Sequence, residues 1–193
     1  MKKNVVIFAF VVSFSGSSLA EGEGEGFFLG AGIGSSGIDT EIGNDTPFPL
    51  SITPTGNSIF LKGGYSFNEF VSMDLTYHNY GDVEFKSLGN GTYSWDPKSL
   101  SINTNLSYPV FGFISPFISV GAGYISLNET DNQIKNDSEL SFRYGAGVEF
   151  NSTKFDPITL TIGYSAERLT LESTRKDYDV TFDSYYVNAN YEF

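Results

Sequence analysis

The chain has 193 residues, with 23 Asp and Glu against 11 Lys and Arg, and its formal net charge is −12. This acidity argues against nucleic-acid binding, because the chain has no basic stripe that could neutralise phosphates. The absence of cysteine excludes disulfides, thiolate chemistry and cysteine-bound metal clusters. A single histidine, His78, also argues against His-rich metal sites and a His-based triad, so no cofactor is expected.

The first twenty residues have the features of a secretory signal peptide. Lys2 and Lys3 form a basic start, residues 5–12 are continuously apolar, and Ser18-Leu19-Ala20 has the small-x-small form of a cleavage site. The apolar run is shorter than the roughly 20 residues that a membrane-spanning helix needs. We therefore expect residues 1–20 to be a signal peptide and residues 21–26 a flexible Glu-Gly leader.

Residues 27–193 are expected to form one domain, because apolar residues recur at every second position through most of this region. Such alternation indicates β-strands with two different faces. No later stretch is long and apolar enough for a membrane helix, and most segments approach the 9–11 residues of a tilted membrane strand. Eight segments alternate in this way: 27–34, 59–67, 71–78, 100–108, 118–124, 142–150, 158–165 and 185–193.

Alternation is expected both in a soluble β-sandwich and in a transmembrane β-barrel. The composition of the less apolar strand face distinguishes these two folds. That face carries Gly, Ser, Thr and Asn, whereas strand faces in water usually carry Lys and Glu. Interior glycine weakens a strand, but in a narrow barrel it makes room for larger lumen neighbours such as Phe60 and Arg143. Aromatic residues also gather near the strand ends, as in an interfacial girdle. The sequence therefore predicts an all-β, eight-stranded antiparallel up-and-down transmembrane β-barrel.

The connections between the predicted strands alternate between short and long. Three short turns lie on one side, and four long polar loops lie on the other, over residues 35–57, 79–98, 127–139 and 167–182. Most of the acidic residues lie in these long loops. In outer-membrane barrels the long loops face the outside, so this acidic end of the barrel should face the exterior. Trp95, in the second long loop, is expected to be an exposed anchor for a partner or the membrane surface. Oxygen-rich segments at 128–132 and 136–139 suit calcium, but they lack EF-hand spacing, and solvated loops are favoured over a metal site.

Several short segments resemble the OmpA-like/opacity-protein family of outer-membrane barrels. The resemblance spans about residues 26–193. It implies a surface-antigen or porin-like barrel in the cell outer membrane, embedded in lipid and lipopolysaccharide. We expect no counterpart of the peptidoglycan-binding domain that accompanies the OmpA barrel, so the resemblance does not imply anchoring to the cell wall by that route. The segments that carry the resemblance are Lys62-Gly63-Gly64-Tyr65 with Val71, Met73, Asp74 and Tyr77; Asn105-Leu106-Ser107-Tyr108-Pro109; Gly145 to Phe150; and Tyr191-Glu192-Phe193.

The resemblance also implies roles for individual residues. Asp74 and Glu149 are similar to acidic members of a lumen cluster described as a gate in OmpA, whereas Asn105 and Thr161 replace its basic members. Lys62 and Arg143 point inward by parity, and Lys62 and Asp74 are expected to be cross-strand partners. These six residues are the predicted lumen cluster, interpreted as either a gate or, preferably, a set of satisfied polar contacts. The terminal aromatics Tyr191 and Phe193 are the expected signal for the barrel assembly machinery.

Catalysis is not expected, although small barrels that cut or acylate lipid A use a histidine near the outer rim. His78 and Asp74 share a strand face, but no serine lies two positions beyond His78. We interpret His78 as a satisfied or exposed polar residue at a strand end. The sequence thus predicts a monomeric outer-membrane protein with a structural or surface-antigen role, its loops available to a host ligand. The alternative is a narrow porin-like channel for ions or small solutes.

Overall fold

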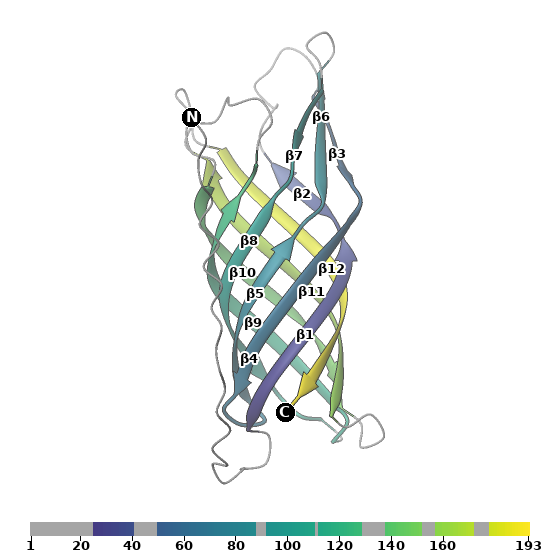
Figure 1. Ribbon diagram of the computed structural model, residues 1–193, viewed down its shortest axis with the longest axis vertical. Helices are drawn as coiled ribbons and strands as arrows, with labels where there is room; N and C mark the ends of the chain where they lie inside the picture. The colour runs from purple at the N-terminus through teal and green to yellow at the C-terminus, as the bar shows by residue number, and fades with distance from the viewer. Residues whose placement is uncertain are drawn as a thin grey trace.

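The computed structural model describes residues 25–40, 50–87, 92–110, 112–128, 138–151, 157–171 and 178–193. These ranges contain eight long strands that form the barrel wall, one short strand paired with the wall at its upper end, and three short strands that project above it (Figure 1). The wall strands are β1 (Gly26–Ser35), β4 (Asn57–Ser66), β5 (Val71–Asn79), β8 (Lys98–Ser107), β9 (Ile114–Ser126), β10 (Ser138–Phe150), β11 (Ile158–Leu171) and β12 (Tyr178–Glu192). The shorter strands are β2 (Gly37–Thr40), β3 (Leu50–Thr55), β6 (Asp82–Ser87) and β7 (Thr92–Trp95).

The wall is a closed antiparallel sheet. Each wall strand pairs with the next in the order β1-β4-β5-β8-β9-β10-β11-β12, and β12 pairs back with β1. At the seam, Ala31 of β1 lies opposite Leu61 of β4 on one side and Ala189 of β12 on the other. Closure pairs the backbone of each wall strand on both sides, which a sheet within lipid requires. The prediction of an eight-stranded up-and-down barrel is confirmed.

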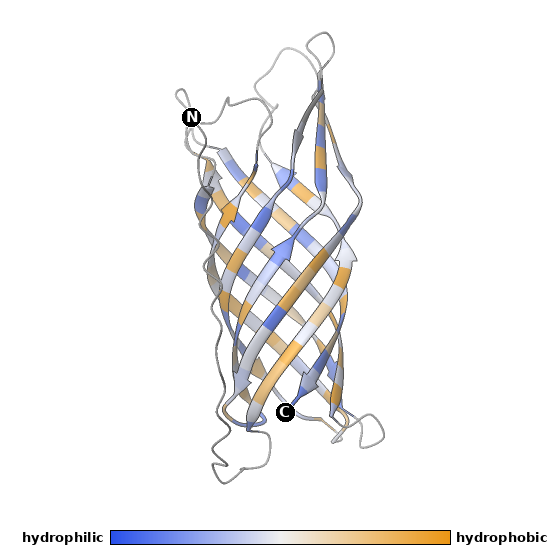
Figure 2. Ribbon diagram, in the orientation of Figure 1, coloured by the Kyte–Doolittle hydropathy of each residue, from blue (hydrophilic) through white to orange (hydrophobic). Residues whose placement is uncertain are grey.

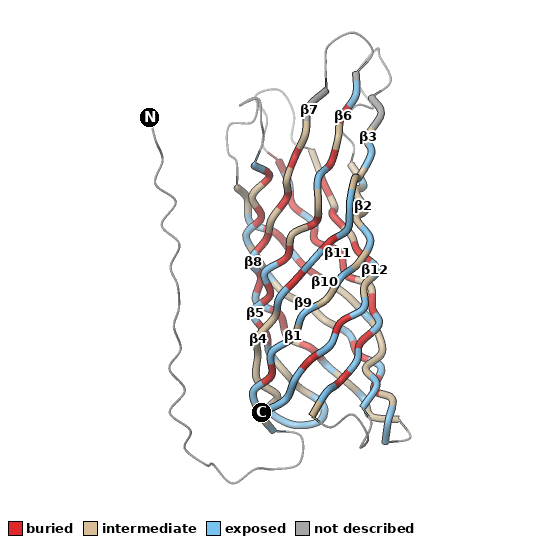
Figure 3. The backbone as a smooth tube through the Cα atoms, turned by 45° about the vertical axis from the view of Figure 1, so that its right-hand side comes forward, coloured by how far each residue is buried: buried red, intermediate tan, exposed pale blue. Residues whose placement is uncertain are grey.

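Hydropathy and burial alternate from residue to residue along the wall strands (Figures 2 and 3), because successive side chains face the outside and the inside of the barrel. In β8, for example, Leu100 and Ile102 are exposed on the outside, whereas Ser99, Ser101 and Asn103 are buried inside. The outer face is thus apolar and the lumen is polar, as expected for strands that contact lipid on one side only. No helix in the described part of the chain is long and apolar enough to cross a membrane.

The two ends of the barrel differ in construction. The lower end in Figure 1 holds the C-terminus and the short connection over residues 67–70 between β4 and β5. At the upper end, β3, β6 and β7 form a separate three-stranded sheet that projects beyond the wall, and β2 pairs with the start of β12.

The prediction of four long loops is therefore partly wrong, because several of the predicted loop residues lie in strands. The range 35–57 contains β2 and β3, and the range 79–98 contains β6 and β7. The range 167–182 contains the end of β11 and the start of β12, since those strands remain hydrogen-bonded beyond the apolar segments that defined them in the sequence. The predicted signal peptide, most of the leader and residues 129–137 of the oxygen-rich segments lie outside the described residues.

Inward-facing glycines make room for bulky lumen side chains. A Cβ atom at Gly147 would lie 2.7 Å from the Phe117 ring, and one at Gly123 would lie 3.0 Å from Oε1 of Glu167. A real Cβ is essentially never closer than 3.0 Å to such a neighbour. The glycines on the polar face are thus part of how this narrow lumen is filled.

Candidate functional site

The lower half of the lumen is organised around Asp74 of β5, which is buried inside the barrel. Its carboxylate accepts hydrogen bonds from the Thr76 hydroxyl at 2.6 Å and from the amides of Asn103 and Asn105 at 2.7 and 2.8 Å. These neutral donors come from the two paired strands β5 and β8. A buried carboxylate with several donors is stabilised without a cation beside it.

The expected partnership between Lys62 and Asp74 is wrong. Lys62 of β4 lies opposite Thr76, and Asp74 lies opposite Gly64, so the two charged residues are diagonal neighbours. Among the described residues, Lys62 forms no ion pair within 4.0 Å, and its ammonium lies 5.7 Å from the centroid of the Phe28 ring. The carboxylate of Asp74 is therefore held by hydrogen bonds from the asparagine amides and not by a contact ion pair with Lys62.

Glu149 and Thr161 also face the lumen, from β10 and β11. Glu149 accepts a hydrogen bond from the Ser107 hydroxyl at 3.2 Å, and Thr161 lies 3.5 Å from the Asn188 amide. Glu149 and Lys62 line a cavity of about 250 Å³ that includes residues of the lower turns, among them Glu69. The structure thus places all six residues of the predicted lumen cluster inside the barrel, but it does not join them into one network.

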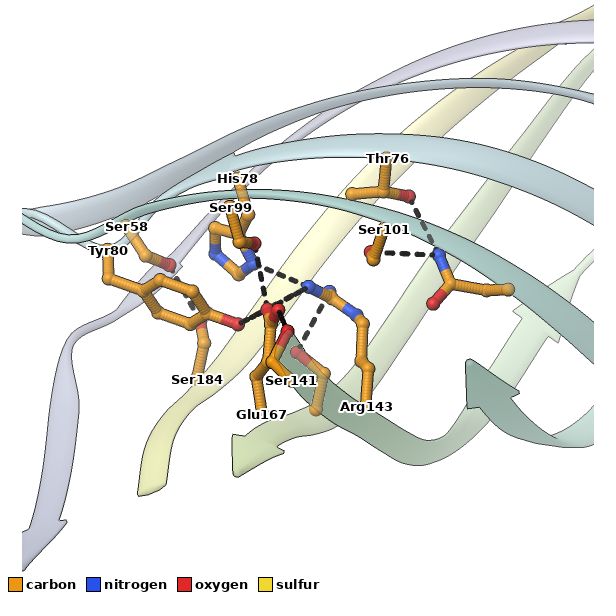
Figure 4. Close-up of polar contacts among 12 residues, drawn as sticks. Ser58, Thr76, His78, Tyr80, Ser99, Ser101, Ser141, Arg143, Glu167 and Ser184 are labelled. Carbon is orange, nitrogen blue, oxygen red and sulfur yellow. Dashed lines mark hydrogen bonds and ion pairs between the residues drawn. The ribbon is translucent and has the colours of Figure 1, made fainter. Parts of the chain in front are cut away.

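A second polar network lies higher in the lumen, around Glu167 of β11 (Figure 4). The Glu167 side chain is fully buried and accepts hydrogen bonds from the hydroxyls of Tyr80, Ser99 and Ser141. Arg143 completes its surroundings with an ion pair of 3.5 Å between Nη1 and Oε2. Glu167 is therefore the acidic partner of Arg143. Its hydrogen bonds also connect β11 with β8, with β10 and with Tyr80, which follows β5.

Arg143 of β10 extends this network to β5. Its guanidinium donates to Nδ1 of His78 at 3.1 Å, to the Tyr80 hydroxyl at 3.3 Å and to the Ser165 hydroxyl at 3.3 Å. A planar guanidinium offers five donors in a fixed geometry, which suits a site with acceptors on several strands. Arg143 thus fixes the relative positions of three strands across the lumen.

His78 is held inside the barrel rather than at an exposed rim. Its ring is fully buried, stacks on Tyr80 with centroids 3.9 Å apart, and lies 5.3 Å from the Phe60 ring. Because Arg143 can only donate, Nδ1 of His78 is the acceptor and the ring proton belongs on Nε2. The Nδ1 lone pair is thereby engaged, so this nitrogen is not free to act as a general base.

An apolar cluster fills the lumen above the Arg143–Glu167 pair. The cluster combines the upper ends of wall strands with residues of the projecting sheet, and buried positions alternate with more exposed ones along these strands (Figure 3). Its rings pack directly, with Phe85 and Trp95 centroids 4.4 Å apart and Tyr80 and Phe182 centroids 5.5 Å apart. The members, called here the upper cluster, are Tyr80, Val83, Phe85, Trp95, Ile125, Leu127, Leu169, Leu171, Val180 and Phe182.

The upper cluster corrects one expectation and reveals one omission. Trp95 was expected to be an exposed anchor, but it is 5% exposed and packs inside the cluster. The sequence predicts a loop at Glu167, whereas in the structure it lies in β11 and faces inward like Thr159, Thr161 and Ser165. Because Glu167 lies two positions beyond the inward-facing Ser165, the alternation itself could have identified it as an acidic residue of the lumen.

These features together define a class of protein. A closed eight-stranded sheet with an apolar outer face and a polar, charge-bearing lumen is a small transmembrane β-barrel. The sequence matches the family described as the outer membrane protein beta-barrel domain over residues 6–193, and the chain belongs to this family. The expected location in the outer membrane is thereby confirmed.

Solved structures of small outer-membrane barrels share this fold. Neisserial surface protein A aligns with a TM-score of 0.61 and 14% identity, over 89% of this chain and 100% of that chain. The N-terminal barrel of Pseudomonas aeruginosa OprF has a TM-score of 0.51 and 12% identity, with coverage of 89% and 100%. Ail, the attachment invasion locus protein of Yersinia pestis, was solved with the heparin analogue sucrose octasulfate; it has a TM-score of 0.50 and 21% identity, with coverage of 89% and 99%. No sequence among curated proteins matches the chain.

Proposed function

We propose that the protein is a non-conducting outer-membrane barrel with a structural and surface-display role. The upper cluster is the observation that supports this proposal. Its packed aromatic and aliphatic side chains lie across the lumen, where a conducting pore would need a continuous polar path. An ion that entered the lower cavity would have to lose its hydration among apolar groups, and apolar interiors stay dry.

The alternative is the narrow channel for ions or small solutes. The polar lower lumen favours it, because the cavity beside Lys62 and Glu149 is lined mainly by Ser, Asn, Thr and charged residues. Conduction would require the upper cluster to move and the Arg143–Glu167 pair to separate, and breaking one partner away from a buried pair is costly. The closed state is therefore the one that we propose for the resting protein.

Planar-bilayer recordings test this proposal directly. For the purified, folded barrel in molar KCl, we expect no current steps above the baseline of the lipid alone. A large general porin added to the same bilayer serves as the positive control. Repeated steps from the folded barrel, lost when heat unfolding shifts its gel migration, would favour the channel.

The surface-display part of the proposal depends on the projecting sheet. With the orientation expected for long connections, β3, β6 and β7 stand outside the cell, and Asp82, Glu84 and Lys86 lie on β6. Glu84 and Lys86 pair at 3.0 Å, with the Lys86 side chain exposed and the Glu84 side chain partly exposed. Polyanions of the kind bound to Ail would meet a chain of net charge −12, so we propose a ligand with exposed cationic groups.

Charge reversal on this sheet tests adhesion. Cells that display the protein should adhere to an epithelial monolayer better than cells with an empty vector. The double variant Asp82→Lys with Glu84→Lys should lose most of this excess, because opposite charges steer and hold the encounter. Glu69→Lys, in a lower turn, is the matched control and should adhere like the unmodified protein. Equal adhesion of displaying and empty cells would remove the adhesive role and leave the structural one.

Two partner assignments complete the proposal. We propose that the barrel is a monomer and that the barrel assembly machinery engages Tyr191 and Phe193 during biogenesis. These side chains are exposed at the lower end, with ring centroids 5.0 Å apart in an edge-to-face arrangement. Export through the signal peptide over residues 1–20 precedes this step.

A further inference from the structure

A groove of about 510 Å³ lies on the outer wall of the barrel, where β1 and β12 meet at the seam. Its lining is almost entirely apolar and comes from β1, β4, β11 and β12. The outward side chains that shape it are Leu29, Ala31, Leu61, Ile158, Ala189 and Tyr191. The groove is separate from the polar lumen described above, and the proposed function does not use it.

The hollow has a simple cause in the sequence. Ala31 and Ala189 lie directly opposite each other across the seam, while Leu61 and Leu160 flank them on the neighbouring strands. Two methyl groups therefore form the floor between larger side chains. Below this row, Leu29, Tyr191 and Ile158 line the groove towards the lower end.

The position of the groove along the barrel identifies its surroundings. A strand that rises about 3.4 Å per residue and is tilted by about 40° gains roughly 2.6 Å of height per residue. Ala31 is the fifth residue after Gly26, where β1 begins at the lower end. It therefore lies roughly 13 Å above that end, within one leaflet of a hydrocarbon core that is about 30 Å thick.

We propose that this groove binds one acyl chain of a phospholipid in the leaflet at the lower end of the barrel. The groove is continuous with the lipid-facing wall, and a flexible methylene chain fills a shallow apolar hollow with close contacts. A second copy of this chain suits the groove less well. Around a two-fold axis at the seam, the same hollow would face itself and leave a void between two alanine floors.

Photo-cross-linking in vesicles tests the proposal. The full barrel is refolded into palmitoyl-oleoyl phosphatidylethanolamine that contains a small fraction of the same lipid with a diazirine on one acyl chain. After irradiation, labelled peptides are mapped by mass spectrometry. We expect label at residues 29–31 and 189–191 to exceed that around the outward-facing Ala122 of β9 and Ala146 of β10, two strands or more away from the seam, by about three-fold.

Leucine substitutions supply matched variants. Ala31→Leu with Ala189→Leu fills the floor and should remove the three-fold excess, whereas Ala122→Leu with Ala146→Leu, also outward-facing, should retain it. Heat-modifiable gel migration shows that each variant is folded. Uniform label over the wall, or label at the seam that survives Ala31→Leu with Ala189→Leu, would overturn the proposal. Protein–protein cross-links at the seam that disappear in that variant would assign the groove to a second copy instead.

Discussion

Replacement of Glu167 by leucine is expected to lower the free energy of unfolding by about 3–5 kcal/mol. The substitution leaves the Arg143 guanidinium buried without its carboxylate and removes the acceptor used by the hydroxyls of Tyr80, Ser99 and Ser141. Urea titration of the barrel in phospholipid vesicles measures the effect. The single tryptophan, Trp95, is a convenient fluorescent reporter because it lies in the adjoining upper cluster.

Two comparisons make this result specific. Glu84→Leu removes a carboxylate whose partner, Lys86, is 60% exposed, and such a pair contributes less than about 1 kcal/mol. The double variant Arg143→Met with Glu167→Leu removes both buried charges and should recover most of the loss, as apolar replacements of buried pairs often do. If Glu167→Leu were as mild as Glu84→Leu, the network around Arg143 would not contribute to the stability of the barrel.

Truncation of Phe182 to alanine is expected to cost about 3–5 kcal/mol of unfolding free energy. Phe182 is fully buried in the upper cluster and packs against Tyr80, so the truncation leaves a cavity that β-strands fixed in a closed barrel cannot easily collapse. We also expect Trp95 fluorescence to become sensitive to iodide, because the cavity admits water to the cluster. Vesicle unfolding and iodide quenching measure the two effects independently.

Phe113→Ala is the matched control for this prediction. Phe113 lies in a lower turn and is 53% exposed, so its truncation should cost about 1 kcal/mol or less and leave Trp95 protected. Iodide quenching of Trp95 in the unmodified protein would contradict the packed upper cluster. It would also weaken the case for a closed lumen, because an ion that reaches Trp95 has passed into the cluster.

The candidate site divides into parts that the sequence could and could not predict. Strand parity placed Lys62, Asp74, Arg143 and Glu149 on the inner face, because the side chains of a strand alternate with a period of two. Parity gives no distances, so it could not show that Asp74 is held by Asn103 and Asn105 instead of Lys62. That choice depends on the register between β4, β5 and β8, in which Asp74 lies opposite Gly64 on one side and Asn103 on the other.

The upper end of the barrel was the least predictable region. Its strands continue beyond the membrane, where the outward residues, such as Arg168 and Thr170, are polar. The relation between polarity and direction is therefore the reverse of that in the lipid-facing wall. The same inversion turns inward residues such as Leu169 and Phe182 into an apolar core. A polar loop and an extended strand with a buried inner face have similar composition, so the sequence alone assigned this region to loops.

The sequence by itself therefore determined the class of fold and the membrane setting, because alternation, strand length and the distribution of glycine and aromatic residues are local properties. The tertiary structure decided which charges meet and whether the lumen is closed. Arg143 and Glu167 are 24 residues apart on neighbouring strands, and Trp95 reaches Phe182 only through the shared cluster. The first contact depends on the register of the β10–β11 pair, in which Arg143 lies directly opposite Glu167. The second depends on closure of the sheet, which brings β12 to the same cluster as the projecting strands, and alternation along the chain specifies neither.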